Sequence, residues 1–258
     1  MKKIYLLMGC TLLCASIYAQ SVSRNEDVLS LSLGYASGAF QDQVFSPLTY
    51  DIRGTAVGLG YTKHTRGGDQ IVIHLDFVTS LLSSDRSDKH DTDNYQGILM
   101  ANYLHHLNPG KGAWQFLAGG GFQSYLNASF FDGTESIAFL GLHAFNIAGK
   151  VTYDLSERHQ FAAALQIPVF GQLVRPPYTG WNKFIQENED TPLRIFTSGN
   201  WTSFQDFFGL NLALNYYYRL SDRWRLLMQY DTRFYRSSTT EITNILAANL
   251  RVGATFNI

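Results

Sequence analysis

The sequence predicts an all-β protein, an antiparallel up-and-down transmembrane β-barrel of about ten strands, with eight to twelve compatible. Three observations predict it. Apolar and polar residues alternate with a period of two in about ten segments. Short connections between these segments alternate with longer ones. Aromatic residues recur at the ends near the short connections. After the N-terminal segment, no stretch has the roughly 18 apolar residues that a membrane helix needs, so strands must do the crossing.

The N-terminus has the three parts of a signal peptide. Residues 1–3 include Lys2 and Lys3, residues 4–18 are largely apolar, and Ala19 before Gln20 is a suitable cleavage site. We therefore predict a signal peptide over residues 1–19 and one barrel domain over residues 20–258. Residues 7–10 also loosely match a lipoprotein cleavage box, although the apolar run before Cys10 is short. Cleavage after Ala19 removes both cysteines, Cys10 and Cys14, and with them disulfides and thiolate metal sites.

The alternation is clearest in the three C-terminal segments. One face collects apolar residues and is expected to meet lipid, whereas the other is polar or small. The outward residues predicted there are Phe208, Leu210, Leu212, Leu214, Tyr216, Tyr218, Trp224, Leu226, Met228, Tyr230, Phe234, Leu246, Ala248, Leu250, Val252, Ala254, Phe256 and Ile258. Earlier segments follow the same rule around Leu31, Leu59, Leu75, Leu99, Phe116, Val151 and Leu165.

The connections sort by length. The short ones are residues 64–69, 108–112, 154–158 and 221–223; the longer ones are residues 37–50, 83–93, 127–136, 170–203 and 237–243. Short turns on the periplasmic side and longer loops outside are typical of outer-membrane barrels. An even number of strands then places both termini on the short-turn side.

Aromatic residues mark the predicted membrane interface at the short-turn ends: Tyr61, Tyr103, Trp114, Tyr153, Phe161, Tyr218, Trp224 and Phe256. A secreted β-sandwich is the soluble alternative, but its turns would not sort by length. Residues 251–258, with Phe256 outward near the end, look like a terminal barrel strand, although Ile258 replaces the usual final aromatic. The chain resembles small single-domain outer-membrane barrel proteins of Gram-negative bacteria. That resemblance implies the bacterial outer membrane as location, and the lipid bilayer and the barrel-assembly machinery as partners.

Charged residues on inward faces form the first candidate site. The predicted lumen network is His74, Asp76, Arg219, Arg225, Asp231, Arg233 and Arg251, with Asn249 beside them. Because unpaired charge is costly inside a narrow barrel, we expect Asp–Arg pairing. The network is either a plug or a charged constriction that selects small solutes.

Two long connections and one histidine are further candidates. Residues 83–93 carry Asp85, Asp88, His90, Asp91 and Asp93, a solvated acidic loop, a cation site or an acid–base site like that of the omptin proteases; no calcium-loop glycine is present. In residues 170–203, Arg175, Tyr178, Trp181 and Trp201 either contact an extracellular ligand or partner or fold into the mouth as a lid. Strict alternation puts His143 outward, where it would lie near the outer interface, unless a bulge turns it inward, where it could act as a general base.

The functional expectation is a non-enzymatic envelope barrel, either a narrow porin-like pore or a structural or partner-docking protein. The alternatives are a barrel enzyme acting on lipid or peptide, and an accessory subunit of an export or uptake complex. With a net charge of -1 and no long basic block, a nucleic-acid partner is not expected. We expect no cofactor and no metal.

Overall fold

The computed structural model describes residues 27–258 except 45, 66, 85–86, 109–111, 132–135, 176–186, 189, 205 and 240; the side chains of 87–91, 131, 136–137, 192–193 and 196 are also not described. The predicted signal peptide lies outside the described residues and stays a prediction.

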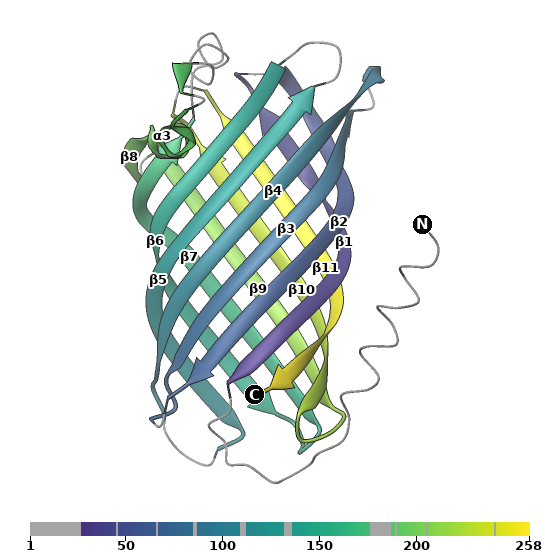
Figure 1. Cartoon of the computed structure of the whole chain (residues 1–258), viewed down its shortest axis with the longest axis vertical. Helices are drawn as coiled ribbons and strands as arrows, with labels where there is room; N and C mark the ends of the chain where they lie inside the picture. The colour runs from purple at the N-terminus through teal and green to yellow at the C-terminus, as the bar shows by residue number, and fades with distance from the viewer. Residues whose placement is uncertain are drawn as a thin grey trace.

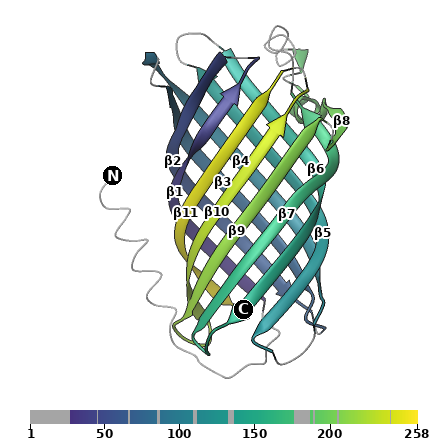
Figure 2. The same ribbon diagram turned by 180° about the vertical axis from the view of Figure 1, so that it is seen from behind.

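Within the described chain, ten antiparallel strands close into one barrel (Figures 1 and 2). They are β1 (Val28–Asp42), β2 (Ser46–His64), β3 (Gln70–Ser84), β4 (Ser87–His106), β5 (Trp114–Phe131), β6 (Ser136–Asp154), β7 (His159–Val174), β9 (Phe207–Arg219), β10 (Trp224–Ser237) and β11 (Thr243–Asn257). Sequential strands are neighbours, and β1 pairs with β11 from Val28↔Asn257 to Asp42↔Thr243. The fold is therefore the predicted up-and-down barrel.

The period-two pattern sets which side chains face outward. Leu31, Leu75, Phe145 and Leu250 are about half exposed, whereas the residues between them point into the lumen. None of the helices in the described part of the chain is long and apolar enough to cross a membrane. Because a closed barrel leaves no unpaired strand edge, its backbone polar groups are satisfied while apolar side chains meet lipid.

The long connections are shorter than predicted, because the strands continue beyond the membrane. β1 and β2 cover most of residues 37–50, and β3 and β4 cover most of residues 83–93. The short connections agree with the prediction: β2 ends at His64 and β6 at Asp154. The longer strands follow from alternation and strand pairing that persist past the apolar band, with Phe40 and Ile52 still facing inward.

The connection between β7 and β9 contains the helix α3 (Pro192–Thr197) and the short strand β8 (Asn200–Ser203). β8 pairs with the outer end of β7, from Phe170↔Ser203 to Leu173↔Asn200. β7 pairs with β9 only from His159 to Gln166. Figure 1 shows α3 and β8 on the outside of the barrel, near its extracellular end.

Apolar side chains fill the extracellular half of the barrel. They form one buried cluster of Phe40, Tyr50, Ile52, Leu82, Ile98, Tyr125, Leu140, Leu142, Ala144, Leu173, Phe207, Tyr235 and Ile245. A narrow barrel packs its interior in this way, so the lumen is occupied above its middle.

Candidate functional site

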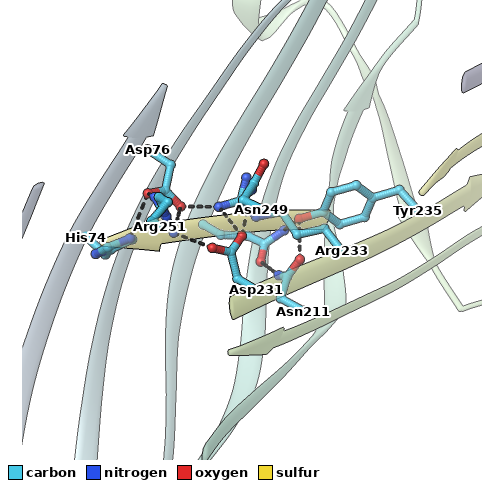
Figure 3. Close-up of polar contacts among 9 residues, drawn as sticks. His74, Asp76, Asn211, Asp231, Arg233, Tyr235, Asn249 and Arg251 are labelled. Carbon is cyan, nitrogen blue, oxygen red and sulfur yellow. Dashed lines mark hydrogen bonds and ion pairs between the residues drawn. The ribbon is translucent and has the colours of Figure 1, made fainter. Parts of the chain in front are cut away.

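A cluster of charged side chains lies inside the barrel, and Figure 3 shows these side chains pointing toward one another. His74 and Asp76 come from β3, Asp231 and Arg233 from β10, and Arg251 from β11. Each strand contributes residues of one parity, since alternate side chains share a face. Five of the seven charged residues predicted for the lumen therefore meet in one place.

The two carboxylates share the two guanidinium groups. Arg233 and Arg251 both pair with Asp76, and Arg251 also pairs with Asp231. Arg233 lies 3.2 Å from the second oxygen of Asp231. Asn249 Nδ2 donates to Asp231 at 2.7 Å, and His74 Nε2 lies 2.8 Å from Asp76 Oδ1. The cluster bridges strands that lie on different sides of the lumen.

These ions are withdrawn from water. The side chain of Arg251 is 0% exposed and that of Asp76 is 1% exposed. Charges this deep are tolerated only when they are paired and hydrogen-bonded. Two carboxylates face two guanidinium groups, so the charges neutralise each other. The arrangement therefore suits a structural role, in which the ion pairs hold strands together across the lumen.

A layer of neutral polar groups connects this cluster to the apolar one. Asn211 Nδ2 donates to Gln123 Oε1 at 2.9 Å, and the Tyr235 hydroxyl donates to Asn211 Oδ1 at 2.7 Å. The rings of Tyr235 and Tyr125 have centroids 4.6 Å apart. Large side chains thus span the lumen immediately above the ions.

A cavity of about 140 Å³ lies on the other side of the ions. Its lining includes Asp231, Arg251, Asn102, Gln166, Asn215 and Lys150, and Lys150 Nζ donates to Gln70 Oε1 at 2.8 Å. The cavity has the size and polarity to hold a few water molecules.

Two arginines predicted for the network lie outside it. Arg219 ends β9 and makes an exposed pair with Asp222 in the following turn. Arg225 is the second residue of β10 and lies 3.5 Å from Gln160 Oε1. Both stand at the periplasmic ends of their strands, so alternation gave their face correctly but not their height in the barrel.

The structure describes two of the four residues predicted as loop contacts at the outer mouth, Arg175 and Trp201. Arg175 is not an exposed contact: it is buried, pairs with Asp42 at 2.5 Å and donates to the Thr239 carbonyl at 2.8 Å. It joins the end of β1 to the connections that follow β7 and β10, because a guanidinium can donate in several directions. Trp201 is 67% exposed on β8 and stacks on Phe170 at 5.1 Å. Tyr178 and Trp181 lie outside the described residues.

His143 faces outward, so a bulge does not turn it into the lumen. The irregularity between β6 and β7 lies at Phe145/Asn146 and leaves the alternation of β6 unchanged. His143 Nδ1 lies 2.9 Å from the hydroxyl of Ser124, its register partner on β5. Sequence reasoning missed Ser124, because the two residues are 19 positions apart and only the strand pairing brings them together.

The acidic connection is not a loop of the predicted form. Residues 87–93 belong to β4, and the side chains of Asp85, Asp88, His90 and Asp91 lie outside the description. Asp93 is exposed on the outward face. Among the described residues no group of three or more His, Cys, Asp or Glu side chains is placed to hold a metal ion.

Comparisons with known proteins bear on the fold. No family model matches the chain, and no curated protein matches it. The outer membrane protease OmpT from Escherichia coli has a similar structure, with a TM-score of 0.53 at 7% identity, covering 93% of this chain and 99% of that one. The Neisserial surface protein A matches with a TM-score of 0.44 at 8% identity, over 90% of this chain and 97% of that one.

The outward apolar surface and the similarity to OmpT agree. A closed barrel with half-exposed Leu, Phe and Tyr around its wall is stable only in lipid. The chain is a multi-strand β-barrel of the bacterial outer-membrane type.

Proposed function

We propose that the protein is a non-conducting outer-membrane barrel that acts as a structural or docking protein through its extracellular end, rather than as a pore. The observation that carries this proposal is the apolar cluster above the ion cluster. Side chains such as Tyr125, Leu142 and Ile245 are fully buried in the extracellular half of the lumen. A charged constriction that conducts ions needs a hydrated path on both sides. The packed side chains above the ions support a lumen that is closed to such a path.

The mouth also supports a docking role. Arg175 ties Asp42, at the end of β1, to the connection after β10, which would hold the extracellular end in one shape. Trp201 and Phe204 are exposed beside it, at 67% and 53%. Exposed aromatic residues on a rigid support are typical of binding surfaces. The ligand would be an extracellular molecule or partner protein, and β11 would be recognised by the barrel-assembly machinery.

Planar-bilayer recording of the refolded protein tests the proposal. We expect no stable current steps from the native chain. A matched variant, Tyr125→Ala with Tyr235→Ala, removes two rings from the packed layer and is expected to produce brief steps. Stable steps from the native chain, altered by Asp231→Asn, would overturn the proposal and restore the narrow pore.

A further inference from the structure

Ser124 and His143 form a polar pair on the lipid-facing wall. They stand directly opposite each other on β5 and β6, and Ser124 Oγ lies 2.9 Å from His143 Nδ1. Their neighbours along the same faces are apolar, including Phe122 on β5 and Phe145 on β6, which are 39% and 57% exposed. Polar side chains facing lipid are costly and often functional, so this pair needs an explanation beyond packing.

The height of the pair is set by the aromatic residues below it. Trp114 and Tyr153 are opposite each other on the same two strands, with ring centroids 4.4 Å apart, at the short-turn end. Ser124 and His143 each lie about ten residues farther along, which at ~3.3 Å per residue and ~40° tilt is about 25 Å. The apolar band of such barrels is also ~25 Å tall. The pair is therefore at the outer edge of the hydrocarbon.

Charged residues on other strands mark the same boundary. Asp51 on β2 and Asp93 on β4 face outward about ten residues above Tyr61 and Tyr103. Two strands thus become polar at the height of the Ser124–His143 pair. In a bilayer this is the level at which acyl chains join the headgroups.

A third polar residue continues the row. Gln172 on β7 stands opposite His143 on the side away from Ser124. Its amide nitrogen donates to the carbonyls of Thr197 at 2.6 Å and Gly199 at 3.0 Å, beside α3. Because the nitrogen is held in this way, the amide oxygen is the atom that can accept from an imidazole N–H.

We propose that Ser124 and His143 form a nucleophile–base pair that hydrolyses carboxylic esters of long-chain lipids in the outer leaflet. The pairing of a hydroxyl with an imidazole within hydrogen-bond reach, with a third group beside the base, is the arrangement that activates serine. Gln172 is assigned as a positioning residue. The proposal does not depend on whether the lumen conducts.

The chemistry is balanced with water as the second substrate. His143 Nδ1 takes the proton of Ser124 while Oγ attacks the ester carbonyl carbon. The carbon–oxygen bond to the alcohol breaks, and the leaving alkoxide takes the proton from His143, which leaves an acyl-serine. Water then attacks that ester, its proton passing through His143 to Ser124 Oγ, and a free fatty acid departs.

The surface beside the pair suits an acyl chain. Leu99 on β4 stands next to Ser124 on its other side, and Leu126 follows Ser124 on β5. Gly141, next to His143 on its face, has no side chain, and the side chains of Val174, Leu126 and Phe139 pack closely over it. An ester entering laterally from the bilayer would find apolar neighbours for its chain and the hydroxyl at its carbonyl.

Two measurements test the proposal. The refolded chain is treated with a long-chain fluorophosphonate in detergent micelles, and the labelled peptide is identified by mass spectrometry. It is also reconstituted in vesicles of diacyl phospholipid, or in vesicles containing lipopolysaccharide, and released fatty acid is quantified. We expect label on Ser124 and fatty acid from one of the two vesicle types, which identifies the source of the ester.

The variants separate chemistry from folding. Ser124→Ala and His143→Asn are expected to lower fatty-acid release by about 100-fold or more. Thr79→Ala and His105→Asn, which change an outward hydroxyl and a histidine at the short-turn end of β4, should leave it unchanged. Gln172→Leu should shift the pH profile of release, with Gln172→Asn restoring part of it. Native protein that takes no label at Ser124 and releases no fatty acid from either vesicle overturns the proposal, whether or not the variants fold.

Discussion

Arg251, on the last strand, and Asp76, on the third, form a buried ion pair across the lumen although 175 positions separate them. Asp231 shares Arg251, so the guanidinium lies between two carboxylates. The pair exists only when the barrel is closed, because β11 must lie beside β1 to bring Arg251 inside. It therefore couples barrel closure to charge neutralisation.

Replacing Arg251 with Met should destabilise the barrel strongly. The change leaves Asp76 and Asp231 buried with only one guanidinium, that of Arg233, between them. Removing one partner of a buried ion pair lowers the free energy of unfolding by about 3–5 kcal/mol. The measurement is the free energy of unfolding from guanidinium titration in lipid vesicles. Arg53→Met is the control, because the Arg53–Asp51 pair is exposed, and exposed pairs contribute about 0–1 kcal/mol. Equal losses in the two variants would contradict a structural role for the cluster.

Gly58 lies against the ion cluster, and adding one methyl group there should disturb it. A Cβ at Gly58 would stand 2.5 Å from the Arg251 guanidinium and 2.8 Å from Asp76 Oδ1. We expect Gly58→Ala to lower the unfolding free energy by about 1–3 kcal/mol, the usual cost of overpacking. Gly97→Ala is the matched control, since nothing lies within 4 Å of its added Cβ; it should be neutral or slightly stabilising. The two variants can be compared by the urea concentration at which gel mobility changes.

The two faces of β9 should respond differently to charge. Leu214 is 44% exposed on the lipid face, and Arg at such a position costs about 2–4 kcal/mol near mid-bilayer. Ala213 lines the cavity and lies opposite Asp231, so Ala213→Arg should cost less than Leu214→Arg. The yield of heat-modifiable barrel after refolding measures both. Equal yields would mean that the assigned faces are wrong.

The turn between β2 and β3 should be sensitive to acid. The Tyr103 hydroxyl and the His106 amide, which donates at 3.0 Å, lower the pKa of Asp69 below 3.8. A carboxylate with a lowered pKa stabilises the folded state above its unfolded pKa, and that contribution is lost as pH falls through the folded pKa. NMR titration of the His106 amide in micelles should therefore show an inflection below pH 3.8, absent in Asp69→Asn. An inflection above pH 3.8 would contradict the assigned hydrogen bonds.

Alternation alone predicted much of the fold and only part of the sites. It predicted the outward faces, the short turns and the inward position of Asp76, Asp231 and Arg251, because successive side chains of a strand point to opposite faces. It did not give height, so Arg219 was grouped with residues far above it. It also did not give partners on other strands, such as Ser124 beside His143, because register depends on which strands pair and with what offset.

The mouth shows a second limit of sequence reasoning. Arg175 stands among Pro, Tyr and Trp residues that suggested an exposed binding loop. Its actual partners are Asp42, at the end of β1, and the carbonyls of Thr239 and Glu241, in the connection between β10 and β11. No local pattern signals a tie of this kind.

The pairing of β1 with β11 closes the circle of strands, and these are the only two neighbouring strands of the barrel that no connection joins in the described chain. Ile258 N donates to the Asp27 carbonyl at 2.8 Å, so the two ends of the barrel domain are hydrogen-bonded neighbours. A short linker could join them, and new ends could be opened in the turn at residues 155–158 without changing a single lumen contact. Circularly permuted forms of this barrel would then show whether closure must begin at β1 and β11, or whether any pair of neighbouring strands can serve as the seam.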